Sequence, residues 1–167
     1  MGSSEVWYGV VTSASSREEP RIRVSDHPFL RGISPDWVAT IGDGSVDTTY
    51  SAGELIAREG EFANRFHLVF HGAVAIEVDA DPDGPRVVQV LGPGEVIDWS
   101  AICPPYVWSF DARARKETRV VSLDTMVLRR ALESRPVEGY QFLKRLLPVV
   151  GSRLERARRQ LSTLPTR

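Results

Sequence analysis

The sequence predicts a mainly β domain, a sandwich or jelly roll, followed by C-terminal helices. Between residues 45 and 123, short apolar runs alternate with glycine-containing turns, a spacing typical of such folds. After Pro136, apolar residues recur at intervals of three and four, which predicts a long helix. The 167 residues suffice for one such domain. We therefore divide the chain into an N-terminal arm (1–25) and one domain (26–165), with the sandwich at 45–123 and the helices at 125–163.

The net charge of −1 conceals an uneven distribution. Residues 1–125 carry 11 Lys and Arg against 19 Asp and Glu, whereas residues 126–167 carry 10 against 3. A basic tail on an acidic body is compatible with nucleic acid or an acidic partner, but a solvated helix face is its commoner meaning. The charge pattern alone therefore assigns no partner.

A single cysteine and the absence of long apolar runs indicate the cellular setting. Cys103 excludes an internal disulfide, fits a reducing compartment, and is interpreted as a small buried hydrophobic side chain rather than a reactive thiol. The N-terminus lacks the basic and apolar regions of a signal peptide, and no run is long enough to cross a membrane. We expect a cytoplasmic protein with no membrane contact.

The first elements are an arm and a short helix. Residues 1–25 include a strand-like run at 6–11 and a Ser/Glu-rich stretch, to which we assign no role. Ser34 and Pro35 then predict a helix start, because serine caps helix N-termini and proline fits the first helical position.

The strands of the sandwich follow in order along the chain. Alternating or continuous apolar runs between turn residues place them at 46–50, 55–58, 66–70, 73–78, 87–91 and 119–123, with a further segment around Ala114. A Pro-Asp-Gly turn at 82–84 joins two of these strands into a hairpin.

Two helices complete the chain. Asp124 or Thr125 caps the first, expected at 126–134, and Pro136 begins the second. Pro148 cannot donate a helical hydrogen bond, so we expect a bend at 147–151. The second helix carries a heptad-like apolar stripe that predicts a homodimer or protein-partner seam, unless its first half packs on the sandwich: Tyr140, Leu143, Leu147, Val150, Leu154, Ala157 and Leu161.

Four segments together resemble a known family in order and spacing. They are 26–30 (DHPFL), 52–61 (AGELIAREGE), 66–72 (FHLVFHG) and 91–95 (LGPGE), and the resemblance to the cyclic nucleotide-binding domain covers roughly residues 26–165. This domain is the sensor of catabolite-activator-type regulators, cyclic-nucleotide-dependent kinases and gated channels. The resemblance implies a double-stranded β-helix (jelly roll) of about eight strands with a short N-terminal helix and C-terminal helices.

The phosphate-binding cassette departs from that family. The family usually has a glutamate for the ribose 2′-hydroxyl and an arginine for the cyclic phosphate. This chain instead has Ile-Asp-Trp at 97–99 and Trp-Ser-Phe at 108–110, so an indole stands at each position. A guanidinium–phosphate bond contributes on the order of 1.5–3 kcal/mol. Three groups could replace the missing phosphate and ribose contacts. The amides of a short helix near 100–103 could hold the phosphate, and Asp98 could accept from the ribose. Arg113 or Arg115 could also approach the phosphate, although their outward-facing position on a strand disfavours this.

The indoles leave two hypotheses of function open. They can stack on a cyclic nucleotide or related small ligand, in a stand-alone regulatory sensor that signals through its C-terminal helices. Alternatively they fill the cavity, in a degenerate, ligand-free interaction or scaffold module. The candidate ligand-binding residues belong to the altered cassette: Gly94, Asp98, Trp99, Ser100, Ala101, Trp108 and Ser109.

Other chemistries are not supported by the sequence. His67 and His71 on one strand would lie about 13 Å apart, too far to share a metal ion, and no nucleophile elbow or phosphate loop is present. We expect no metal site and no enzymatic activity. The chain ends soon after the long helix, so we expect no helix-turn-helix and no DNA binding. Four arginines of that helix are interpreted as a solvated face or a contact for an acidic partner: Arg153, Arg156, Arg158 and Arg159.

Overall fold

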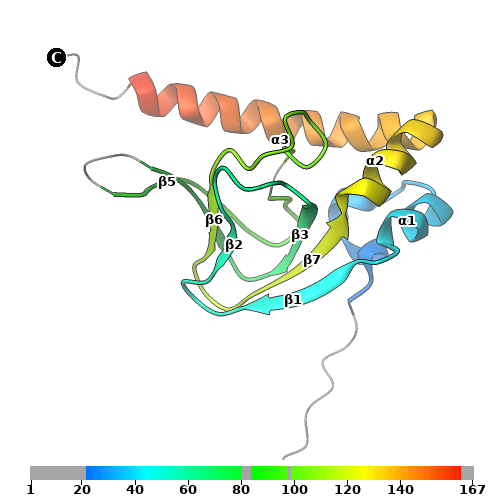
Figure 1. Cartoon of the computed structure of the whole chain (residues 1–167), viewed down its shortest axis with the longest axis horizontal. Helices are drawn as coiled ribbons and strands as arrows, with labels where there is room; N and C mark the ends of the chain where they lie inside the picture. Colours follow the sequence, from blue (N-terminus) through cyan, green and yellow to red (C-terminus); the bar gives the residue numbers. More distant parts are fainter. Residues whose placement is uncertain (1–21, 80–83, 98, 163–167) are drawn as a thin grey trace, which may run out of the picture.

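The protein's structure is a computed structural model that describes residues 22–79, 84–97 and 99–162 (Figure 1). The predicted strand at 6–11, most of the N-terminal arm and Asp98 lie outside the described residues, as does part of the turn at 82–84. The side chain of Leu161 is likewise outside this description.

The β-domain consists of two antiparallel sheets that pack face to face (Figure 1). One sheet has the order β1-β7-β3 and the other β2-β6-β4-β5. The named strands of the described residues are β1 (Val46–Tyr50), β2 (Leu55–Ala57), β3 (Arg65–His71), β4 (Val74–Val78), β5 (Arg86–Leu91), β6 (Asp111–Ala114) and β7 (Thr118–Asp124). The sandwich or jelly roll predicted from the sequence is confirmed.

An additional extended segment beside β3 occupies the place of an eighth strand. Ile97 donates from its backbone N–H to the carbonyl of His67 at 3.0 Å, and Val69 donates to the carbonyl of Glu95 at 3.0 Å. Leu68 and Val96 form the bridge between the two segments. Residues 95–97 are therefore fixed to the central part of the roll.

Tight turns join the strands where only glycine fits. Gly72, between β3 and β4, has φ of +95°. A Cβ atom at this position would lie 2.5 Å from the carbonyl oxygen of Glu117, far closer than van der Waals contact allows. The β3–β4 turn is thus packed directly against the start of β7.

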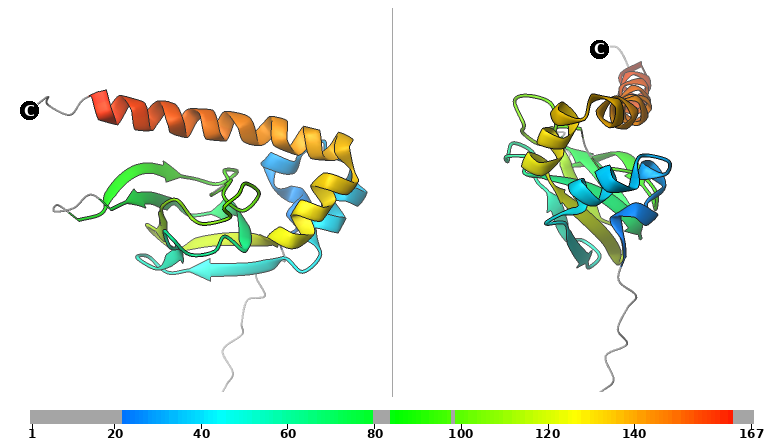
Figure 2. Two further views of the ribbon diagram at one scale, coloured as in Figure 1. Left: turned by 45° about the horizontal axis from the view of Figure 1, so that its top comes forward. Right: turned by 90° about the vertical axis from the view of Figure 1, so that its right-hand side faces the viewer.

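The helices gather at one end of the roll and along one side of it (Figures 1 and 2). They are two 3₁₀ turns, η1 (Val24–Asp26) and η2 (Pro28–Leu30), and α1 (Pro35–Gly42), α2 (Thr125–Ser134) and α3 (Pro136–Ser162). Ser34 precedes α1 as predicted, but its side chain makes no capping bond. Asp124 caps α2, accepting from the backbone N–H groups of Met126 and Val127 at 2.8 and 3.2 Å.

An aromatic cluster joins the helices to the sheets. The ring of Phe142 in α3 lies 5.1 Å from Phe29, 5.7 Å from Trp37 and 5.4 Å from Phe66, between ring centroids. Trp37 also donates from its indole N–H to the carbonyl of Ala131 in α2 at 3.2 Å. Since Phe142 is fully buried, its burial contributes about 1.5–3 kcal/mol. The first half of α3 is thereby anchored to the domain.

The bend expected at 147–151 does not interrupt α3, which continues through Pro148 as one helix to Ser162 (Figure 2). The face towards the roll buries Phe142, Leu146 and Arg153. The predicted apolar stripe lies mainly on the outside, where Leu147 is 71% and Leu154 is 70% exposed. Most of this stripe therefore faces away from the body of the domain.

Candidate functional site

The altered cassette, defined here as residues 92–110, begins with a tight turn and then runs into a series of bends. Gly92 donates from its backbone N–H to the Glu95 carboxylate at 2.7 Å, closing the first turn. The short helix expected near 100–103 is absent: these residues form turns, one closed by the Ile102 N–H on the Trp99 carbonyl at 2.9 Å. Pro104 and Pro105 lack the N–H groups that would extend a helix. The amides of a helix start are thus not available for an anion.

The second half of the cassette pairs with the loop between β2 and β3. Trp108 donates to the carbonyl of Glu61 and its own carbonyl accepts from Gly60, both at 2.9 Å. Ala63 donates to the carbonyl of Tyr106 at 2.7 Å. This short ladder fixes the backbone of residues 106–108 and decides where the Trp108 indole points.

The Trp108 indole is buried against β3. It is 4% exposed and lies nearly parallel to the His67 ring, 5.4 Å away at 18°. His67 Nδ1 is 2.7 Å from the Ser122 hydroxyl. Burial, reinforced by the positive charge of Arg65, lowers the pKa of His67 to about 4, so this ring is neutral near pH 7. One face of Trp108 is thus taken by a neutral imidazole.

Trp108 also lines a cavity of about 330 Å³ between the two sheets. The wall is largely polar and comes from β1, β2, β3, β7 and the loop between β2 and β3, with Thr48, Asn64 and Ser122 among its residues. The cavity is within the lower part of the range usual for small-molecule pockets.

Trp99 has a different environment from Trp108. It is half-buried and contacts Phe110 edge to face, with 6.3 Å between ring centroids and an angle of 68°. The Arg153 guanidinium of α3 lies over both rings, 5.1 Å from the Trp99 centroid and 5.4 Å from that of Phe110. Arg153 Nη2 donates to the carbonyl of Val96 at 2.7 Å. The long helix therefore reaches into the cassette.

The position of Arg153 corrects the expectation that it belongs to the solvated helix face. It is 8% exposed, whereas Arg156, Arg158 and Arg159 are exposed. Residues 142, 146 and 153 share one side of the helix because of its 3.6-residue period, and the apolar stem of an arginine can cross such a face. The spacing of these residues is visible in the sequence, but the charge of an arginine ordinarily indicates the opposite face.

The other candidate ligand residues divide between this site and the core. Ser100 is buried, and its hydroxyl lies 3.4 Å from the hydroxyl of Ser109, which is exposed. These two serines are the sequence neighbours of Trp99 and Phe110, whose rings are in contact. Ala101 is fully buried in the core. Gly94 forms the turn against Pro28, where a Cβ atom would lie 3.3 Å from Pro28 Cγ. The structure thus brings Trp99, Ser100 and Ser109 together and turns Trp108 away.

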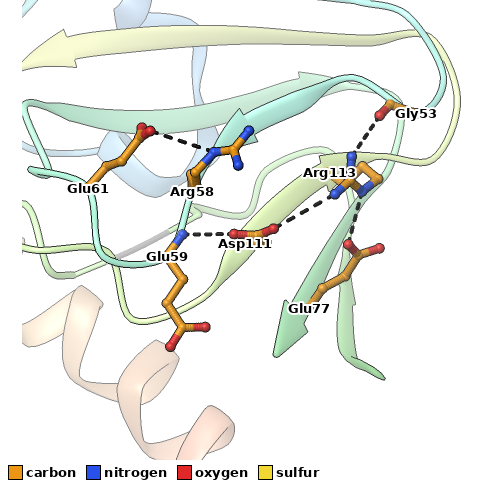
Figure 3. Close-up of polar contacts among 7 residues, drawn as sticks. All are labelled: Gly53, Arg58, Glu59, Glu61, Glu77, Asp111 and Arg113. Carbon is orange, nitrogen blue, oxygen red and sulfur yellow. Dashed lines mark hydrogen bonds and ion pairs between the residues drawn. The ribbon is translucent and has the colours of Figure 1, made fainter. Parts of the chain in front are cut away.

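Arg113 and Arg115 are not directed at the cassette. Arg113 Nε donates to Glu77 at 3.0 Å and Nη1 donates to the carbonyl of Gly53 at 3.1 Å, on the outer face of the sheet (Figure 3). The neighbouring Ala112 and Ala114 are the buried residues of β6, and Arg115 is exposed. Strand alternation places Arg113 outside the roll, in agreement with the expectation from the sequence.

A second contact between helix and cassette is not evident from the sequence. The Arg129 guanidinium of α2 lies 4.1 Å from the centroid of the Tyr106 ring. Tyr106 has φ of +59°, which orients its backbone unusually for a residue with a side chain. No local pattern connects residues 106 and 129, so only the folded chain shows that α2 as well as α3 contacts the cassette.

Cys103 is exposed, which corrects the prediction that it is buried. It is followed by the two prolines that hold the loop at the surface. Within the described ranges, no group of three or more His, Cys, Asp or Glu side chains could hold a metal ion. In the same part of the chain, no helix has both the length and the apolar character to cross a membrane.

The fold and the site define a class of protein: a jelly-roll domain with a loop cassette that C-terminal helices contact. The profile of the cyclic nucleotide-binding domain matches residues 47–135, more than half of the chain. The chain therefore belongs to the cyclic nucleotide-binding domain family.

Known proteins agree with this assignment. The chain is 27% identical over 137 residues to the CRP-like cAMP-activated global transcriptional regulator of Mycobacterium tuberculosis, covering 81% of this chain. It spans 59% of the length of that curated relative. Among solved structures, a cyclic nucleotide-binding domain from Methylobacillus flagellatus has a TM-score of 0.72 at 19% identity, covering 87% of this chain and 84% of that one.

A putative cyclic nucleotide-binding protein from Geobacter metallireducens has a TM-score of 0.68 at 23% identity. It covers 79% of this chain and 96% of that one. At this level of identity, the structural similarities define the fold and not the ligand.

Proposed function

We propose that this domain is a regulatory sensor that binds a nucleotide-like or other small ligand at the cassette and signals through its C-terminal helices. One observation carries the proposal: both C-terminal helices contact the cassette, α2 through Arg129 on Tyr106 and α3 through Arg153 on Trp99. A change at the cassette would alter contacts of both helices. A ligand with different affinities for two helix arrangements would shift their populations.

The ligand contacts would centre on Trp99 rather than on Trp108. Trp99 is half-buried and faces a guanidinium, whereas Trp108 is stacked on His67. A planar ring stacking on an indole gains about 1–3 kcal/mol. The hydroxyls of Ser100 and Ser109 would then supply polar contacts in place of the family's glutamate and arginine.

Isothermal titration with cyclic AMP, cyclic GMP and cyclic dinucleotides tests the ligand. Saturable binding of one of them, weakened by Trp99→Leu and Ser100→Ala, would support the proposal. Arg113→Met is the matched control, because Arg113 is engaged on the outer face and its loss should leave affinity unchanged. No heat from any of these nucleotides at high protein concentration would overturn the nucleotide version.

The partner would be a second copy of the chain, docked through the exposed stripe of α3. Tyr140, Leu147 and Leu154 are 65–71% exposed and share the heptad spacing that helix pairs use. Leu147→Asp should convert a dimer to a monomer in sedimentation equilibrium. Glu155→Lys, an exposed charge change outside the stripe, should leave the dimer intact. A wild-type protein that is monomeric at every concentration would refute the homodimer.

The ligand-free scaffold remains the second candidate, because the Arg153 guanidinium covers the Trp99 ring and the Trp108 indole is buried against His67. It predicts a melting temperature that none of these nucleotides raises. Since a ligand that binds only the folded state must stabilise it, a reproducible increase would exclude the scaffold.

A further inference from the structure

The two halves of α3 are held to the domain in very different ways. The half before Pro148 buries Phe142 and Leu146 in the hydrophobic core. In the stretch 151–159, where the structure describes every side chain, Arg153 is the only buried residue. Residues 151–159 of the helix are therefore attached to the roll chiefly through one side chain.

Arg153 contacts the cassette at three places. Its guanidinium donates to the carbonyl of Val96 at 2.7 Å and covers the rings of Trp99 and Phe110. Val96 precedes the bends of the cassette and Phe110 ends them, so one group bridges both sides of the loop. A planar guanidinium over an indole occupies the space that a planar ligand stacking on that face would need.

The helix between these two anchors is suited to bending. Pro148 has no N–H and leaves the Lys144 carbonyl without its helical bond. A Cβ atom at Gly151 would have no neighbour within 4 Å, so close packing does not require glycine there. Glycine also has one of the lowest helix propensities. Val149 and Val150, directly after Pro148, still pack against the core. Release of Arg153 would thus free residues 151–159 without disturbing the core around Phe142.

We propose that Arg153 is an intramolecular latch, which holds the second half of α3 on the unliganded cassette and is displaced when a ligand stacks on Trp99. The ligand part of this statement rests on the proposed function, whereas the latch itself does not. Leu154 and Ala157 of the apolar stripe lie on the released half. Occupancy of the site would therefore change the helix segment that a second copy would contact.

Hydrogen–deuterium exchange of the ligand-free protein tests the latch. A charge-assisted hydrogen bond and a cation–π contact together imply that Arg153→Met lowers amide protection across 151–159 by about tenfold to a hundredfold. Protection across 138–147 should stay at the wild-type level. Arg156→Met, on the same half of the helix but exposed, is the control and should behave as wild type.

Unchanged protection at 151–159 in Arg153→Met would overturn the latch. A loss that extends over the whole domain would do the same, because it would show Arg153 to be an ordinary core group. A double-mutant cycle between Arg153→Met and Trp99→Leu, read by urea unfolding, gives a second measurement. We expect the two substitutions to have non-additive effects on the free energy of unfolding. Additive effects would contradict a direct contact between Arg153 and Trp99.

Exchange in the presence of cyclic AMP separates the latch from the proposed function. If titration shows binding, displacement predicts faster exchange at 151–159, and slower exchange there would refute it. If titration shows no binding of any nucleotide, the nucleotide version of the proposed function fails. The latch is then still decided by the ligand-free comparison of Arg153→Met with Arg156→Met.

Discussion

His67 should make the domain less stable in mild acid. Its ring is 4% exposed, stacked on Trp108 and hydrogen-bonded to Ser122. A neutral Nδ1 can accept from the Ser122 hydroxyl, an arrangement that protonation of this nitrogen would remove. Arg65 adds a positive charge nearby, and burial is the larger cause of the lowered pKa. His67 therefore binds a proton less readily in the folded protein than in the unfolded chain.

The size of the effect follows from the two pKa values. The folded pKa of His67 is about 4, against an ordinary histidine pKa of 6.5. The unfolded state binds more protons between these values, so the stability contributed by the neutral ring is fully present above pH 6.5. It is lost as pH falls from there towards 4. The total loss is about 3 kcal/mol at 1.36 kcal/mol per pKa unit.

Urea unfolding as a function of pH, for wild type and His67→Gln, isolates this group. Glutamine keeps a polar side chain near Ser122 but does not titrate. His27, whose pKa burial also lowers, is present in both proteins, so its contribution cancels in the difference. We expect the wild type to lose about 3 kcal/mol more than His67→Gln between about pH 7 and pH 4. Parallel curves would show that the ring is not buried in its neutral form.

Three further substitutions test the fold and the site. Gly72→Ala should lower the free energy of unfolding in urea by more than about 2 kcal/mol, because the added Cβ meets the start of β7. Gly53→Ala, also at positive φ but in open space, should lower it by only about 1 kcal/mol. Equal losses in the two variants would contradict this packing. Phe142→Ala should cost about 3–5 kcal/mol, and Leu143→Ala on the exposed side of α3 less than about 1 kcal/mol when measured on the monomer. Arg113→Met should lower the free energy of unfolding by less than about 1 kcal/mol, since its ion pair is partly exposed; a loss of ligand affinity in this variant would show that Arg113 does reach the site.

The order and type of the elements were predictable from local patterns. Turn residues and short apolar runs located β1 at its observed bounds and placed the other strands to within a few residues. Ser34 and Pro35 marked the start of α1, and Asp124 marked that of α2. These signals depend on backbone geometry within a few residues, which is why they can be interpreted without the rest of the chain.

Local patterns located the cassette in the sequence, but they did not predict how its side chains are arranged. Its two tryptophans look alike in the sequence, because each stands where the family usually has a charged residue. In the structure Trp108 stacks on His67 and Trp99 faces Arg153. Which indole turns inward depends on the ladder with the β2–β3 loop, a pairing between segments about 45 residues apart. Local pattern carries no information about such a pairing.

The sequence by itself determined the family fold, the loss of the glutamate and arginine from the cassette, and the apolar stripe of α3. Only the tertiary structure decided that an arginine of α3 lies on the cassette, that the apolar stripe of α3 faces mainly outwards, and that Trp108 rather than Trp99 is stacked on His67. The physical reason is that periodicity specifies which face of an element a side chain occupies. It does not specify which distant element meets that face, and the contact between Arg153 and Val96 joins residues 57 positions apart.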